Sequence, residues 1–153
     1  MGYSPRRLAF RFHRTAGSTG LRSAQAFVLL SEIRPRGGGT LVLSGSHHLV
    51  SRFVERTGRE PRPNLVRSAL AADPELAALW GRSAAPSADE DRVSRFLDQG
   101  FTVDGFDLSV VEVTGRPGDV YLMNSDCFHA VATNSLDTPR LMLTSVIIRS
   151  DPT

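Results

Sequence analysis

The sequence contains no lysine, and its eighteen basic residues are arginines scattered along the chain. No basic run is interleaved with aromatic residues, which excludes the usual pattern of a nucleic-acid-binding domain. Cysteine is almost absent: the single Cys127 excludes a disulfide within the chain and suits a reducing compartment. No apolar run is long enough to cross a bilayer, and no signal peptide follows the N-terminal arginine pair. A cytoplasmic protein without membrane or nucleic-acid partners is therefore expected.

Strand-like segments dominate both ends of the chain. The 153 residues are enough for one domain with a substantial core. Alternating or continuous apolar runs predict strands over 7–13, 24–33 and 40–46, and again over 106–113, 119–124, 127–133 and 140–150. These seven strands predict a mainly β fold.

Helical patterns are confined to one block between the third and fourth of these strands. The block covers about residues 48–100 and predicts a helix up to Gly58, a helical segment interrupted at Asp73-Pro74, and a short helix that ends at Gly100. Because the helices are not interleaved with strands, the order favours an antiparallel sheet over a βαβ layout. A double-stranded β-helix, that is, a small jelly roll of the cupin-like kind, fits this order best. The helical insertion is expected to close over the mouth of the barrel and to influence substrate choice.

The segment 118–143 contains the most informative polar residues. If the strands 127–133 and 140–150 form a hairpin, with Thr133 opposite Arg140, then His129 lies opposite Thr144. His129 and Arg140 then share a face at an axial offset of about 13 Å, which would accommodate a short dicarboxylic acid between them. The planar guanidinium suits a carboxylate better than an ammonium would. A hairpin with two structural polar residues explains the same spacing.

Two sequence stretches, GGGTLVLSGSHHLV and the later GDVYLMNSDCFHAVATNSLDTPR, resemble the phytanoyl-CoA dioxygenase family of iron(II)- and 2-oxoglutarate-dependent oxygenases. The resemblance covers roughly residues 10–149. It implies a double-stranded β-helix that hydroxylates a small or lipid-like organic substrate. In that family two histidines and one carboxylate hold Fe(II), and an arginine about eleven residues after the second histidine binds the co-substrate 2-oxoglutarate.

By this resemblance His129 is the distal iron ligand, His13 the first iron ligand, and Arg140 the clamp for 2-oxoglutarate. The chain departs from the family pattern at Thr15, which stands where the carboxylate ligand of the His-x-Asp motif is expected. Only about twelve residues precede His13, so the N-terminal part of the family fold is expected to be missing. The alternative is a diverged or truncated β-helix domain that binds a small acid or a partner without turnover.

Other residues have simpler interpretations. Glu32 and Asp126 lack the spacing expected of a replacement iron ligand. His47 and His48 follow a glycine-containing turn and are expected to pack or to cap the next helix, and Ser46 is a further candidate for the cap. Cys127 and His129 lie two apart on one predicted strand, but no orienting acid or oxyanion-hole motif accompanies them, so a nucleophilic Cys-His pair is disfavoured.

Overall fold

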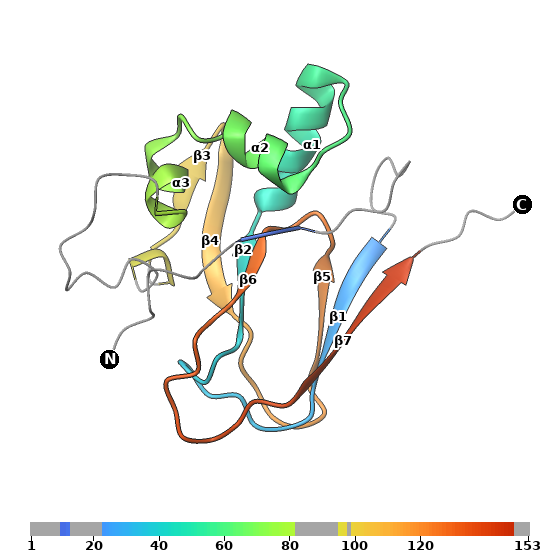
Figure 1. Cartoon of the computed structure of the whole chain (residues 1–153), viewed down its shortest axis with the longest axis vertical. Helices are drawn as coiled ribbons and strands as arrows, with labels where there is room; N and C mark the ends of the chain where they lie inside the picture. Colours follow the sequence, from blue (N-terminus) through green and yellow to red (C-terminus); the bar gives the residue numbers. More distant parts are fainter. Residues whose placement is uncertain (1–9, 13–22, 82–94, 98, 149–153) are drawn as a thin grey trace, which may run out of the picture.

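The computed structural model describes residues 10–12, 23–81, 95–97 and 99–148. These residues form two antiparallel sheets and a group of helices (Figure 1). One sheet has three strands in the order β5-β1-β7, and the other has four in the order β3-β4-β2-β6. The mainly β fold with antiparallel sheets is confirmed.

The chain crosses between the two sheets several times. The three-stranded sheet contains β1 (Ser23–Leu29), β5 (Val120–Asn124) and β7 (Met142–Ile148). The four-stranded sheet contains β2 (Thr40–Ser44), β3 (Phe101–Val103), β4 (Phe106–Glu112) and β6 (His129–Val131). The chain therefore passes from one sheet to the other after β1, β4, β5 and β6.

The helical block lies between β2 and β3, as the sequence predicts. It contains α1 (Ser46–Thr57), α2 (Pro63–Ala69) and α3 (Pro74–Leu79). Asp73 caps α3, because its carboxylate accepts the backbone N–H groups of Glu75 and Leu76, each at 3.0 Å. None of the helices within the described ranges has the length and apolar character needed to cross a membrane.

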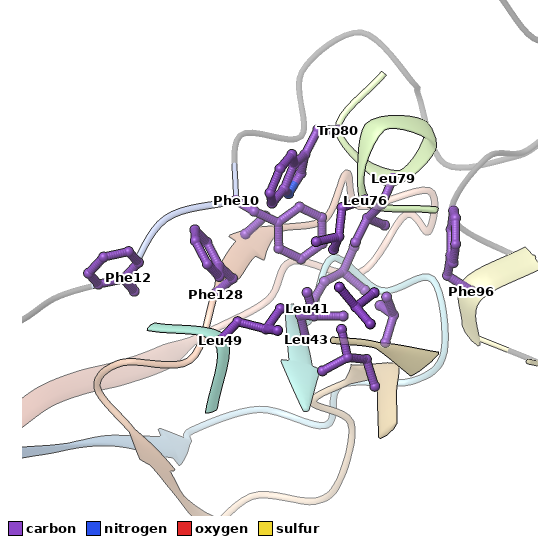
Figure 2. Close-up of a cluster of buried hydrophobic side chains, with 14 of the residues drawn as sticks. Phe10, Phe12, Leu41, Leu43, Leu49, Leu76, Leu79, Trp80, Phe96 and Phe128 are labelled. Atoms are coloured by element: carbon purple, nitrogen blue, oxygen red, sulfur yellow. The ribbon is translucent and has the colours of Figure 1, made fainter. Parts of the chain in front are cut away.

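The main core lies between the four-stranded sheet and the helices (Figure 2). Leu41 and Leu43 of β2 are fully buried there, because alternate residues of a strand point to the same face. Phe128 packs in the same cluster, edge-to-face against Phe12 at 5.0 Å between ring centroids and 5.8 Å from the ring of Trp80. The other members include Phe10, Leu49, Val66, Leu76, Leu79 and Phe96.

This packing corrects the prediction that the helical block closes over the mouth of a barrel. The buried residues of α1, α2 and α3 face Leu41 and Leu43, on the side of the sheet that faces away from the other sheet. Of the described helical block, only the start of α1, at His47, contributes to the cavity between the sheets. The helices have broad apolar faces, and burying those faces on the sheet decides their position.

The first predicted strand, 7–13, is described only at residues 10–12. Phe10 and Phe12 are buried and Arg11 is exposed, which agrees with the predicted alternation. Arg11 forms an antiparallel bridge with His129.

Candidate functional site

The space between the two sheets is the candidate site. Val42 of β2 points into this space, because its neighbours Leu41 and Leu43 point to the helices. Val42 lies opposite Val111 of β4 on one side and opposite His129 of β6 on the other. Paired residues of adjacent strands share a face, so His129 belongs to the face that looks toward the three-stranded sheet.

A cavity of about 320 Å³ lies between the sheets. Its walls are mainly apolar, and both sheets contribute to them. The lining includes Phe27, Val42, Val111, Val113, Tyr121 and Met123, with Ser44, His47 and Cys127 as polar or polarisable members. This composition is typical of a pocket for a small, largely apolar ligand with a few oriented polar groups.

His47 and Cys127 meet at this wall of the cavity. The Nδ1 atom of His47 lies 3.7 Å from Sγ of Cys127. Burial is the main reason that the pKa of the Cys127 thiol is raised; the Asp126 carboxylate raises it further, while His47 and Ser46 act in the opposite direction. Burial also lowers the pKa of His47, with a smaller contribution from the neighbouring charge of His48. Both groups are therefore mostly neutral at pH 7, which does not suit a thiolate nucleophile.

Ser46 fixes the approach of α1 to β6. Its hydroxyl donates to the Leu43 carbonyl at 2.5 Å and accepts the backbone N–H of Phe128 at 2.9 Å. The predicted capping role of Ser46 or His47 is wrong, because the N-cap of α1 is Gly45 in the left-handed conformation, without a side-chain cap. The predicted packing role of His48 is confirmed: its ring stacks on Phe106 with 5.0 Å between centroids.

Two buried polar atoms close to the cavity, Oε1 of Gln25 and Oγ of Ser125, have no hydrogen-bond partner among the residues that the structure describes. Gln25 and Phe27 share a face of β1, and Gln25 lies opposite Met123 of β5. The backbone N–H of Ser125 donates to Ser23, which continues this pairing by one step. A buried polar group without a partner costs about 1–3 kcal/mol, so a ligand or water that satisfied these atoms would be favoured there.

His129 is buried and is held from three sides. Its backbone exchanges two hydrogen bonds with Arg11, at 2.8 and 2.6 Å, while its strand pairs with β2 on the other edge. The ring Nδ1 lies 3.0 Å from the carbonyl oxygen of Cys127. A carbonyl can only accept, so Nδ1 of His129 donates this hydrogen bond and carries a proton.

Arg140 precedes β7 and reaches across to the other sheet. Its guanidinium donates to the carbonyl of Gly38, which lies in the turn before β2. Gly38 precedes Val42 by four residues, and Val42 lies opposite His129. The Arg140 contact therefore lies beyond the start of β2, on the side of the strand away from α1.

The predicted hairpin of β6 and β7 is wrong. Thr144 lies opposite Phe27 of β1, and His129 lies opposite Val42, so the two strands belong to different sheets. The connection between them folds on itself, because the Asn134 side chain bonds the Thr138 carbonyl and the Leu136 N–H. His129 and Arg140 therefore approach the space between the sheets from opposite walls instead of along one face.

The remaining predicted ligands are not assembled with His129. His13 and Thr15 lie outside the described residues. Glu32 is exposed and forms an ion pair with Arg34 at 3.7 Å, so it does not replace the missing carboxylate. Within the described ranges no group of three or more His, Cys, Asp and Glu residues is placed to hold a metal ion.

Comparisons of the chain with protein-family models, with curated proteins and with solved structures find no match.

The sequence reasoning missed the contribution of His47 to the cavity. The only local indication of this contribution in the sequence is the glycine turn before α1. Gly45 adopts φ 82° there, and the first turn of the helix places His47 beside Cys127. A pairing between residues 80 positions apart has no local pattern in sequence.

Proposed function

We propose that this chain is a double-stranded β-helix domain of the phytanoyl-CoA dioxygenase type. It would use Fe(II) and 2-oxoglutarate to hydroxylate a small or lipid-like organic substrate held between the sheets. A cytoplasmic location belongs to the same proposal. The observation that carries it is that His129 lies on the face of the four-stranded sheet that looks toward the other sheet, while Arg140 is anchored at Gly38, four residues before the Val42 that pairs with His129.

The topology supports the β-helix part of the proposal. Repeated crossing between two antiparallel sheets, with β6 beside β2 and β7 beside β1, is the strand order that winding a long double ribbon produces. The cavity between the sheets lies where such folds commonly bind ligands.

The positions of the two polar residues support a carboxylic acid as ligand. A guanidinium has five N–H groups, and the hydrogen bond to Gly38 fixes its direction while using one of them. A fork anchored in this way can bind a carboxylate in two parallel hydrogen bonds. The Cys127 carbonyl likewise orients the His129 ring, in the manner of the outer partners that orient metal-binding histidines.

The described residues fit an iron site only in part. Such a site needs two histidines and one carboxylate on one face of the metal. His129 is one candidate ligand, His13 is the second by sequence, and Thr15 cannot supply the carboxylate. Fe(II) with 2-oxoglutarate would provide the oxidising chemistry when bound.

The second candidate function is small-acid binding without turnover. The threonine at position 15 favours this function, because it removes a ligand that oxygen chemistry needs. Arg140 and the apolar cavity would be retained as a binding site.

The experiment is anaerobic addition of Fe(II) and 2-oxoglutarate, with detection of the weak visible charge-transfer band of the chelate. The natural chain is compared with the His129→Ala, Arg140→Ala and Thr15→Asp variants. His48→Ala is the matched control, because that ring stacks on Phe106 instead of facing the cleft.

A band that His129→Ala abolishes and His48→Ala retains would support the oxygenase. A band only in Thr15→Asp would favour the binding domain that has lost its metal. With no band in any variant, but 2-oxoglutarate binding that Arg140→Ala weakens at least tenfold, acid binding alone would remain. No band and no binding would overturn both functions.

A further inference from the structure

One edge of the three-stranded sheet is open. β7 pairs with β1, and no described strand lies on the other side of β7 (Figure 1). The carbonyl of Leu141 accepts the N–H of Leu30, which fixes the alternation of backbone groups along β7. The amides and carbonyls that point away from β1 are therefore those of Met142, Thr144, Val146 and Ile148.

This edge has none of the features that usually prevent strand association. β7 reads MLTSVII, without charge or proline, and β1 and β5 contain no charged residue either. Natural edge strands are commonly protected by lysine, proline, a bulge or an inward-pointing charge. A partner at this edge is thus recognised by its backbone and apolar side chains, not by charge.

Both faces of β7 are apolar and exposed. Its large side chains Leu143, Val146, Ile147 and Ile148 are 57%, 47%, 52% and 58% exposed. Leu143 and Ile147 point to one face of β7 and Val146 and Ile148 to the other, and together they present on the order of 400 Å² of apolar surface. Two copies that buried this surface against each other would bury on the order of 800 Å² in total, below the size of a standard interface, so the expected association is weak and reversible.

We propose that the partner is β7 of a second copy of this chain, paired antiparallel about a two-fold axis at Ser145. This register overlaps all seven residues of β7. It places Leu143 opposite Ile147 of the partner subunit, and the remaining pairs are also self-complementary because a two-fold repeats each contact. The outward-pointing backbone groups meet each other, and the two sheets join into one of six strands.

Ser145 provides a specific test of this register. It is exposed, and its backbone groups point toward β1, so it faces its own copy as a non-hydrogen-bonded pair with Cα atoms about 4.5 Å apart. That separation permits a disulfide. Ser145→Cys is oxidised with copper phenanthroline and examined on a non-reducing gel, with the exposed helical Ser51→Cys as the matched control. The buried Cys127 remains in both proteins.

Light scattering during gel filtration measures the mass of the natural full chain from 5 to 200 µM. We expect a dimer at the upper concentrations, cross-linking of at least half of Ser145→Cys, and little of Ser51→Cys. Val146→Lys should raise the dimer dissociation constant at least tenfold, while Leu65→Lys, at an exposed leucine of α2, should not change it.

Three results would overturn the proposal. They are a monomer at every concentration, a dimer that Val146→Lys leaves intact, and a dimer in which Ser145→Cys cross-links no faster than Ser51→Cys. Slow amide exchange at Thr144 and Val146 in a monomer would show that another segment of the same chain covers the edge.

Discussion

At the scale of single residues, the cavity between the sheets contains polar groups in unusual states. Burial raises the pKa of the Cys127 thiol and favours its neutral form, and the side-chain carbonyl oxygen of the buried Gln25 has no partner within the described part of the chain. The contribution of each of these two side chains to stability can be measured by mutation without knowing the ligand.

Raising the pH is expected to destabilise the protein through Cys127. Its pKa in the folded protein is raised above the ordinary thiol value of 9.0, so the folded state keeps a proton that the unfolded chain releases. Stability from this group is thus present below about pH 9 and is lost as the pH rises further. The free energy of unfolding in urea, measured at pH 7, 9 and 10, should fall more in the natural chain than in Cys127→Ala. An equal fall in both proteins would contradict the assignment.

Replacing Gln25 by methionine is expected to leave the unfolding free energy unchanged or to raise it by about 1 kcal/mol. The substitution keeps the approximate shape of the side chain and removes Oε1, a buried oxygen that no described residue satisfies. The same change should weaken a ligand that bonds to Oε1. Thermal and urea unfolding provide the measurement, with Gln25→Glu as the contrast, which should destabilise by burying a charge. A loss above 1 kcal/mol in Gln25→Met would show that the carbonyl is satisfied in solution.

At the scale of elements, the short helices depend on their caps. α3 has only six residues, and its first turn is held by the carboxylate of Asp73 with Pro74 at the first helical position. The sequence predicted this junction correctly, because an Asp-Pro pair before an apolar run is a local signal.

Asp73→Ala should lower the unfolding free energy by about 1 kcal/mol, since it leaves the N–H groups of Glu75 and Leu76 without their acceptor. Asp73→Asn should cost much less, because the amide oxygen accepts the same bonds. Urea unfolding of the two variants distinguishes capping from a general effect of charge. An equal loss in both would show that the negative charge at the start of α3, and not the cap, is what stabilises it.

Some elements could be predicted from the sequence and others could not. The alternation in β4 and the continuous apolar run in β1 predicted these strands, whereas the three-residue β3 was too short to leave a pattern. The pairing of β7 with β1 was not predicted. Both β1 and β6 are apolar strands that could pair with β7, and only tertiary packing determines which of them does. For the candidate site, sequence identified His129 and Arg140 as residues of interest, but not the walls on which they lie.

At the scale of the whole molecule, Phe128 connects the parts of the main core. It lies between the sheet and the helices, in contact with Phe12 and Trp80 (Figure 2). The Phe128 ring thus contacts both the N-terminal segment and the end of the helical block, which favours a single cooperative unfolding transition.

Phe128→Ala is expected to lower the unfolding free energy by about 3–5 kcal/mol, the usual cost of removing a buried aromatic ring. Val131→Ala, at an exposed position at the end of β6, should change it by less than about 0.5 kcal/mol. Unfolding followed by both fluorescence and circular dichroism would give coincident transitions in the natural chain. A loss below 1 kcal/mol for Phe128→Ala would contradict this role.

The pairing of β1 with β7 also sets the order of events during synthesis. β1 (23–29) can pair with β7 only after residues 142–148 have been synthesised. More than one hundred residues are synthesised between the two strands. Contacts this distant in sequence slow folding, and an apolar strand that waits for its partner is exposed to other chains. The rate at which the nascent chain is completed, and the chaperones that it meets meanwhile, therefore bear on its yield in the cell.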